Sequence, residues 1–201
     1  MAILDLEWLR GRSLDTVARG MIRGGATVLQ YRDKISETAR QFENAENLRR
    51  LAGEGRIPLI INDRLDIALA VGADGIHAGQ NDLPLAVIRR LAPGMKVGIS
   101  IGSLEEFRCS ADADYHGVGA VYPTASKQVE KVPGLNLIRQ VRRHSRQPLI
   151  GIGGINETNV EAVIRSGCDG VAVISAIMGE EDVEEATRRL RMKINRVKAE
   201  P

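Results

Sequence analysis

The sequence has few aromatic residues and no strong excess of charge of either sign, and each shortage excludes a class of protein. Phe, Trp and Tyr make up 3% of the 201 residues, so we expect a core of Val, Ile, Leu and Ala. The 28 basic and 26 acidic residues give a net charge of +2, which is too balanced to indicate a nucleic-acid partner. No apolar run reaches the roughly 18 residues that a membrane-spanning helix needs.

Cysteine is also scarce, and its placement argues against a metal site. Cys109 and Cys168 lie far apart in the sequence with no ligand spacing, so we expect both to be buried thiols in a reducing compartment. The segment Met1–Glu7 carries acids where a secretory signal would be basic. Both features predict a cytoplasmic protein. The sequence leaves the oligomeric state open, a homo-oligomer included.

Short apolar runs alternate with amphipathic stretches along the whole chain. The expected strands are Ala2–Leu6, Thr27–Tyr31, Pro58–Ile61, Gly75–His77, Lys96–Ile99, Tyr115–Gly119, Pro148–Ile152 and Gly170–Ile174. The expected helices include Leu14–Arg23, Thr38–Leu51, Leu85–Leu91, Leu135–Arg143, Val160–Ser166 and Val183–Val197. Eight β/α units predict a short TIM (β/α)8 barrel that forms one domain over residues 1–201. An open parallel sheet is the alternative.

Polar residues follow the second strand, at the end where barrel active sites form. In Gln30-Tyr31-Arg32-Asp33-Lys34, strand alternation sends Gln30, Arg32 and Lys34 to one side, and Tyr31 and Asp33 to the other. Arginine offers a bidentate fork to phosphate, and lysine offers a mobile point charge. The segment therefore predicts an anion site, with a solvated rim as the alternative.

Two carboxylates, Asp63 and Asp82, follow the third and fourth expected strands. Mg²⁺ suits one or two carboxylates, with water and substrate phosphate oxygens as its other ligands. Each residue also has a local alternative: Asp63 can cap a helix that begins near Leu65, and Asp82 can cap one before Pro84. The pair predicts a magnesium site only if the two loops converge.

The later strands end in hydroxyl groups and glycines. Ser100 follows the fifth strand, and the long segment after the sixth strand carries hydroxyl groups and a lysine that can bind phosphate or lie in a plain surface loop. Glycines after the seventh strand, beside the end of the eighth, predict a second phosphate site made of backbone N–H groups. The residues in these last two segments are Thr124, Ser126, Lys127, Gly153, Gly154, Ile174 and Ser175. His77 and His116 fall in strands and are expected in the core, whereas His144 is expected to be exposed.

Five segments together resemble the thiamine-phosphate synthase family. They are Gln30–Lys34, Ile61–Asp66, Gly75–Pro84, Tyr122–Lys127 and Ile152–Ile155. The resemblance implies a (β/α)8 barrel that uses Mg²⁺. Its two small-molecule substrates would be 4-amino-5-hydroxymethyl-2-methylpyrimidine diphosphate and 4-methyl-5-(2-phosphoethyl)thiazole, and its products thiamine phosphate and diphosphate.

The resemblance also implies a role for each matching residue. The pyrimidine diphosphate would be held by Gln30, Arg32, Lys34, Asn62, Ser100 and Lys127, and we include Tyr31 and Asp33 of the same segment. The thiazole phosphate would be held by Thr124, Ser126, Gly154, Ile174 and Ser175, and we include Gly153. Asp63 and Asp82 would bind magnesium, and Arg32, Ser100 and Lys127 would act in catalysis.

One departure bears on the alternatives. The family often has a histidine two residues after the serine of the fifth strand, where this chain has Gly102. A sister family of thiazole tautomerases uses that histidine and tends to lack the metal set, so both differences favour the synthase. A non-catalytic barrel that binds phosphate is a further alternative, and it would have no need of a metal-assisted site.

Overall fold

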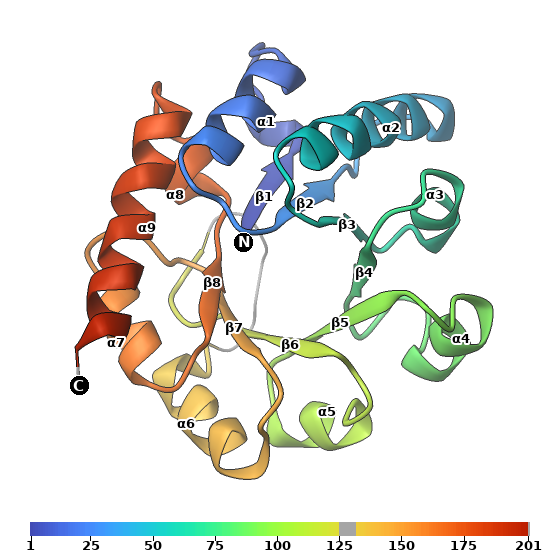
Figure 1. The fold of residues 1–201 in the computed structure, drawn as a ribbon. Helices are drawn as coiled ribbons and strands as arrows, with labels where there is room; N and C mark the ends of the chain where they lie inside the picture. The colour runs from blue at the N-terminus through green and yellow to red at the C-terminus, as the bar shows by residue number, and fades with distance from the viewer. Residues whose placement is uncertain (125–131, 201) are drawn as a thin grey trace.

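The computed structural model describes residues 1–124 and 132–200, and this part of the chain forms a barrel of parallel strands inside a layer of helices (Figure 1). Eight strands make one sheet in the order of the sequence, and each pairs in parallel with the next. They are β1 (Ala2–Asp5), β2 (Leu29–Arg32), β3 (Leu59–Asn62), β4 (Gly75–Ala78), β5 (Lys96–Ile101), β6 (Tyr115–Gly119), β7 (Leu149–Ile152) and β8 (Gly170–Ala172). The predicted barrel is therefore confirmed.

The first and last strands close the barrel. Ala2 forms a parallel bridge with Val173. Ile3 N donates to Val173 O at 3.0 Å, and Val173 N donates to Met1 O at 3.3 Å. The open-sheet alternative is excluded because β1 and β8 are joined.

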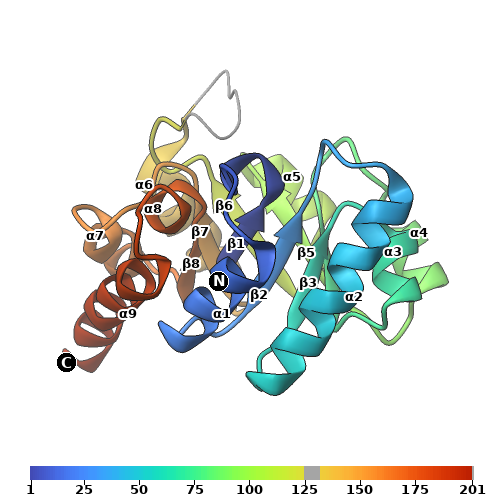
Figure 2. The same cartoon turned by 90° about the horizontal axis from the view of Figure 1, so that it is seen from above.

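Helices cover the outside of the barrel, and neighbouring helices touch one another. They are the 3₁₀ helix η1 (Leu6–Trp8), α1 (Leu14–Arg23), α2 (Thr38–Glu54), α3 (Leu65–Ala70), α4 (Leu85–Leu91), α5 (Leu104–Cys109), α6 (Gly134–His144), α7 (Val160–Arg165), α8 (Ser175–Met178) and α9 (Val183–Ala199). The long C-terminal helix α9 lies against α1 and α7, and α1 lies against α2 (Figure 2). None of the helices within the described residues is long and apolar enough to cross a membrane.

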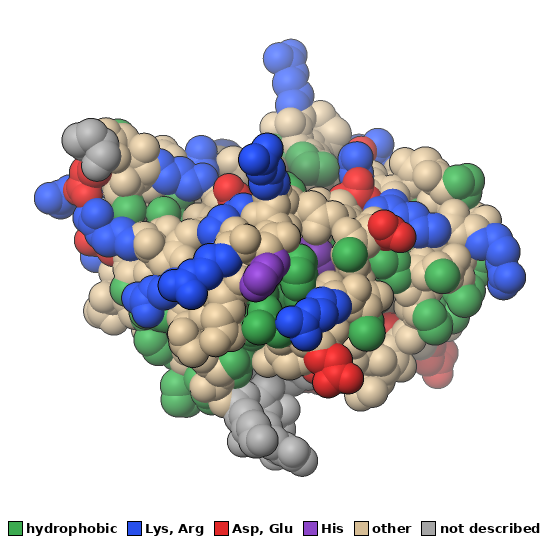
Figure 3. Space-filling model, turned by 90° about the horizontal axis from the view of Figure 1, so that it is seen from below, with side chains coloured by type: hydrophobic (Ala, Val, Ile, Leu, Met, Phe, Trp, Pro, Cys, Tyr) green, Lys and Arg blue, Asp and Glu red, His purple; other side chains and the backbone are tan. Residues whose placement is uncertain are grey.

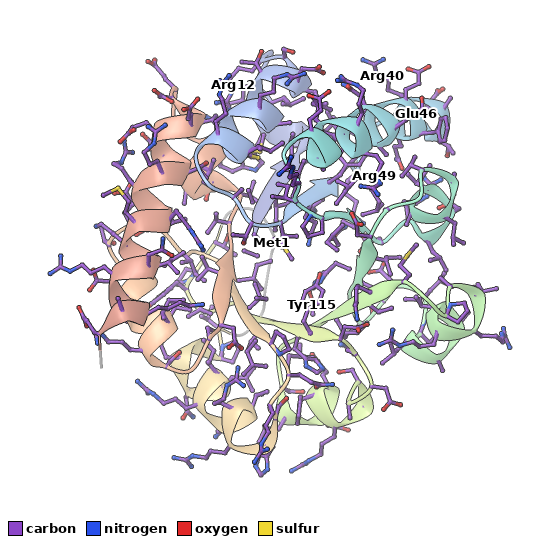
Figure 4. The ribbon with its side chains drawn as sticks, viewed as in Figure 1. Met1, Arg12, Arg40, Glu46, Arg49 and Tyr115 are labelled. Atoms are coloured by element: carbon purple, nitrogen blue, oxygen red, sulfur yellow. The ribbon has the colours of Figure 1, made fainter. Side chains whose placement is uncertain are left out.

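The core has an outer and an inner layer, as strand alternation requires. Leu29, Leu59 and Val97 belong to the outer layer between strands and helices, where each is fully buried. Inside the barrel, Asn62, His77, Gly98 and Tyr115 occupy one register row across β3 to β6. Figure 4 shows Met1 and Tyr115 within the ring of strands.

Surface charge is scattered. Figure 3 shows one face of the molecule, on which basic side chains are separated by acidic and apolar ones. Cys168 is buried as expected, and burial raises its thiol pKa to about 12. The same expectation for Cys109 is wrong: this residue ends the short helix α5 with its side chain exposed, because the apolar side of that helix is provided by Phe107.

Candidate active site

The ends of β2, β3 and β4 bring an ammonium group and two carboxylates together. Lys34 Nζ donates to Asp63 Oδ2, and the carboxyl groups of Asp63 and Asp82 are within hydrogen-bond contact. The three residues come from consecutive βα loops, which meet because parallel strands end at the same edge of the barrel. The two loops that carry the predicted magnesium ligands therefore converge.

Local backbone contacts fix both carboxylates. Asp63 has a left-handed φ of 60°, which Asp adopts more readily than most residues, and its N–H donates to His77 O at 2.8 Å. Asp82 Oδ2 accepts a hydrogen bond from Gly79 N at 2.7 Å. Neither acid caps the helix after it, since the N-cap positions of α3 and α4 are Arg64 and Pro84. The capping alternatives are therefore wrong.

The environment of Asp63 favours a nearby cation. Burial raises the pKa of this carboxyl, and the adjacent Asp82 raises it further, while Lys34 opposes both effects. A divalent cation between the carboxylates would relieve their repulsion. Among the described residues no group of three or more His, Cys, Asp or Glu side chains could hold a metal ion.

Arg32 has a buried partner that the sequence reasoning missed. Its guanidinium donates to Asp5 Oδ2, and Asp5 is 1% exposed at the end of β1. The two residues are opposite each other in the β1–β2 register. Asp5 also accepts from Glu7 N at 3.0 Å, so it joins the start of η1 to the arginine. An acid at the end of the first expected strand, level with a strand-end arginine, was the available signal.

The other residues of the second strand segment divide as alternation predicts. Gln30 lies inside the barrel, 2% exposed, with Nε2 donating to Met1 Sδ at 3.2 Å. Tyr31 faces the helices, and its hydroxyl donates to Asp33 Oδ2 at 2.8 Å and accepts from Asn44 at 3.2 Å. Burial raises the pKa of Tyr31, which keeps the phenol protonated.

Asp33 also turns away from the barrel axis, into the loop before α2. Its Oδ1 accepts from the N–H groups of Ile35 (3.0 Å) and Ser36 (2.9 Å). Burial alone would raise the pKa of Asp33, but these hydrogen bonds and the one from Tyr31 outweigh it and lower the pKa. Tyr31 and Asp33 thus brace the loop that presents Lys34. Their predicted contact with the pyrimidine diphosphate stays a prediction.

Asn62 and Ser100 lie at strand ends near the carboxylates. Asn62 ends β3, half-buried, opposite His77 in the register. Ser100 Oγ is 2.8 Å from His77 Nε2, and Ser100 O accepts from Gln80 Nε2 at 2.7 Å. Gly102, at the position of the family histidine, donates its N–H to Glu106 Oε2 at 2.6 Å.

The ends of β6 and β7 are joined through backbone. Gly153 and Gly154 have left-handed φ angles of 95° and 64°. Tyr122 N donates to Gly153 O at 3.0 Å, which holds the segment after β6 against the turn after β7. A Cβ on Gly154 would lie 2.4 Å from Pro123 O, so glycine is required by the close approach of these two loops.

Three of the remaining predicted thiazole-phosphate ligands, Thr124, Ile174 and Ser175, are among the described residues. Ile174 precedes the single-turn helix α8, and Ser175, exposed, begins it. Thr124 is half-buried at the edge of the described chain. Ser126 and Lys127 lie outside the described residues.

A cavity of about 440 Å³ lies beside this site rather than in it. It opens between the segment after β1 and the helix α2, near Arg12 and Arg40 (Figure 4). Arg12 already donates to Glu180 O at 2.8 Å and Trp8 O at 3.0 Å, and Arg40 pairs with Glu43 at 2.9 Å. None of the predicted site residues that the structure describes lines this cavity.

Cationic side chains and left-handed glycines at the carboxyl ends of barrel strands are typical of (β/α)8 enzymes that bind phosphorylated small molecules there. The fold and the site place the chain in that class. Residues 1–177 match the family model described as thiamine monophosphate synthase, and the chain belongs to that family.

Individual relatives agree with the family match. The chain is 44% identical to the thiamine-phosphate synthase of Chloroflexus aurantiacus over 196 residues, which cover 96% of this chain and 91% of that protein. It is also 44% identical to that of Methanocella arvoryzae over 197 residues, covering 96% and 93%. The solved structure of thiamine phosphate pyrophosphorylase from Pyrococcus furiosus superposes with a TM-score of 0.90 at 38% identity, covering 98% of this chain and 95% of that one.

Proposed function

We propose that the chain is a transferase that performs the reaction for which its family is named. It joins the pyrimidine methylene of 4-amino-5-hydroxymethyl-2-methylpyrimidine diphosphate to the nitrogen of 4-methyl-5-(2-phosphoethyl)thiazole. A C–O bond to diphosphate breaks and a C–N bond forms, giving thiamine phosphate. The observation that carries the proposal is the cluster of Lys34, Asp63 and Asp82 at three consecutive strand ends, in a chain of this family.

The diphosphate would bind over the ends of β2 to β5. Arg32 and Lys34 provide positive charge, and they form ion pairs with Asp5 and Asp63. A diphosphate can exchange for these carboxylates, because its oxygens accept the same charge-assisted hydrogen bonds. Asn62 and Ser100 offer further polar groups, and we assign Lys127 to the same substrate.

Asp63 and Asp82 would hold Mg²⁺. The donor set fits this ion, which is usually held by one or two carboxylates, with water and substrate oxygens as its remaining ligands. Burial and the neighbouring Asp82 raise the pKa of Asp63, and a divalent cation between the two carboxylates would oppose both effects. When bound, Mg²⁺ would neutralise charge on the diphosphate.

The chemistry requires stabilisation of charge more than proton transfer. The amino group makes the pyrimidine electron-rich, so its methylene can lose diphosphate and become a stabilised cation. Arg32, Lys34 and Lys127 would stabilise the growing charge of the leaving group, and the barrel mouth would align the thiazole nitrogen. We place the thiazole phosphate at Thr124, Ser126, Gly153, Gly154, Ile174 and Ser175, opposite the carboxylates.

One assay tests this function. Purified protein is incubated with both substrates and Mg²⁺, and thiamine phosphate and diphosphate are quantified with and without a chelator. The proposal requires equal amounts of both products and their loss with the chelator. The variant Asp66→Asn is a matched control, since Asp66 is an exposed acid on α3 that pairs with Arg64. Absence of both products, with or without Mg²⁺, would contradict the proposal and favour the tautomerase alternative, which neither joins the two substrates nor releases diphosphate.

The location and assembly of the protein stay predictions. A cytoplasmic location fits a biosynthetic enzyme with free thiols, Cys109 and Cys168. A homo-oligomer can be tested by light scattering of the purified chain.

A further inference from the structure

Ser100 contacts the first of two linked rings inside the barrel, the buried His77 and the half-buried Tyr115. His77 Nε2 lies 2.8 Å from Ser100 Oγ, and His77 Nδ1 lies 3.0 Å from the Tyr115 hydroxyl. His77 and Tyr115 both belong to the register row of Gly98, two residues before Ser100 on β5. This chain of hydrogen bonds therefore connects the floor of the site to the interior of the barrel, where Figure 4 shows Tyr115.

Two glycines make room for these rings. A Cβ on Gly98 would lie 2.0 Å from Cζ of Tyr115, and a Cβ on Gly117 would lie 3.0 Å from Cε1 of His77. A side chain at Gly98 would displace the Tyr115 ring, and one at Gly117 would crowd the His77 ring. The ring positions are thus set by the barrel backbone, which gives the imidazole a fixed orientation toward Ser100.

One direction of the hydrogen bonds along this chain satisfies all three side chains. Burial raises the pKa of Tyr115, so the phenol keeps its proton. If that proton is donated to His77 Nδ1, the ring proton of the neutral imidazole must be on Nε2. Nε2–H then donates to Ser100 Oγ, and the hydroxyl proton of Ser100 points to another acceptor.

We propose that His77 and Tyr115 are positioning residues: with the ring proton on His77 Nε2, they hold the Ser100 hydroxyl as a hydrogen-bond donor toward the pyrimidine diphosphate. The inference rests on the proposed function and adds two residues that do not touch substrate. Gln80 fixes the same serine from the other side, through its hydrogen bond to Ser100 O. Ser100 is thereby held at both its backbone and its side chain.

The tautomer is the first test, and it needs no substrate. In ¹⁵N NMR of the uniformly labelled protein, Nε2 of His77 should carry a proton and Nδ1 should have the shift of an acceptor nitrogen. His144→Gln is the assignment control, because His144 is exposed at the end of α6. In Tyr115→Phe, which keeps the ring against Gly98, the Nε2–H preference should be lost. A wild-type signal from the Nδ1–H tautomer overturns the proposal.

Kinetics form the second test. Tyr115→Phe should lower kcat by about tenfold to a hundredfold, while KM for the thiazole phosphate stays within about twofold. Unchanged kcat in this variant overturns the proposal. An equal loss in kcat and in thiazole-phosphate affinity also overturns it, because that pattern indicates general damage to the barrel.

Substitution of the histidine separates positioning from packing. The amide nitrogen of His77→Gln can replace Nε2–H as a donor to Ser100, whereas His77→Ala cannot donate. The glutamine variant should therefore keep about tenfold more activity than the alanine variant. Equal activity in the two variants, with both folded by circular dichroism, contradicts a positioning role.

These results can be distinguished from failure of the proposed function. If the wild-type protein makes no thiamine phosphate, the function is wrong. If the wild-type protein is active and Tyr115→Phe is equally active, only the positioning role is wrong.

Discussion

The two halves of the barrel mouth differ in composition: charged side chains form one half, and glycine-rich backbone forms the other. The charged half, at the ends of β1 to β4, consists of Asp5, Arg32, Lys34, Asp63 and Asp82, whose side chains pair with one another. The glycine half, at the ends of β6 to β8, is shaped by backbone, with the segment after β6 hydrogen-bonded to the turn after β7.

The difference predicts how each half responds to substitution. In the charged half, a ligand must exchange for existing ion pairs, so changes of charge at constant shape should have large effects. In the glycine half, the loops approach too closely for a side chain, so an added Cβ should have a large effect without any change of charge. The predictions below test this contrast, from the largest expected effect to the smallest.

Removal of one carboxylate charge should have the largest effect. Asp82→Asn keeps an oxygen for the hydrogen bond from Gly79 N, so the loop should stay in place while the proposed magnesium site loses a charge. We expect kcat/KM to fall at least about a hundredfold. Steady-state assays over a range of Mg²⁺ concentrations give this value.

The control for that experiment is the exposed acid Asp66. Asp66→Asn should be as active as the wild-type protein. Wild-type activity of Asp82→Asn at limiting Mg²⁺ would show that Asp82 is no metal ligand.

Addition of a single methyl group should disturb the glycine half. In Gly154→Ala the new Cβ meets Pro123 O, and the residue must also keep a φ of 64°. We expect the affinity for the thiazole phosphate to fall about tenfold or more, while the pyrimidine diphosphate binds normally. Because of this clash, the substitution should displace the segment after β6. The new methyl group should also block the phosphate from the backbone N–H groups of the turn after β7. Calorimetric titration of each substrate measures both affinities.

Gly72→Ala separates the clash from the backbone strain. Gly72 has nearly the same φ, 61°, but within the described chain no atom beyond its two sequence neighbours lies within 4 Å of its Cβ position. This variant should lose about 1–2 kcal/mol of stability from strain alone and keep both affinities. If the two variants bind the thiazole phosphate equally well, the close approach of the loops does not shape the site.

The comparison also explains which parts of the structure the sequence could predict. The helices Leu14–Arg23 and Leu85–Leu91 and the strand Tyr115–Gly119 have the expected bounds, because a clear apolar periodicity lies between residues that end it. The short helices α5 and α8 were missed. Each is shorter than two helical turns, which is too short to show a helical periodicity of apolar residues. Tertiary contacts determine whether such segments are helical.

The charged residues at strand ends were easier to predict than the residues that they contact. Lys34, Asp63 and Asp82 were identified because polar residues after apolar runs stand out in a sequence. The pairing of Arg32 with Asp5 depends on strand register, and the contact of His77 with Tyr115 depends on space left by Gly98. Register and side-chain volume inside a barrel are properties of the assembled sheet, so one sequence does not display them.

Substitution of Asp5, the buried partner of Arg32, should have an intermediate effect on substrate binding. Asp5→Asn keeps the shape and the acceptor for Glu7 N but removes the charge that orients the guanidinium. We expect about tenfold weaker binding of the pyrimidine diphosphate, measured by calorimetry, with little change for the thiazole phosphate. Asp15→Asn, which changes a carboxylate on α1 that is 43% exposed, is the control. Unchanged binding by Asp5→Asn would show that Arg32 is oriented by other contacts.

The smallest expected effect is a pH dependence of stability that arises outside the barrel mouth, in the layer between β6 and α5. His116 of β6 is 0% exposed, and its Nδ1 has no hydrogen-bond partner among the residues that the structure describes. Burial lowers the pKa of His116, although its contact with the backbone of Ser110 opposes the shift. The folded state therefore holds the neutral imidazole, and the unfolded state binds the proton near pH 6.5. The free energy of unfolding is therefore unaffected by His116 above that pH, and it decreases as the pH falls below it.

Urea unfolding at pH 7.5 and pH 5.5 measures this decrease. The wild-type protein should lose up to about 1.4 kcal/mol more than His116→Leu between these two pH values, since the leucine variant has no imidazole to protonate. Asp63, in the charged half, acts with the opposite sign: its raised pKa means that protonation favours the folded state as the pH falls. That effect is common to both proteins and cancels in the difference. An identical pH dependence in the two proteins would show that the folded state can protonate His116 as readily as the unfolded chain does.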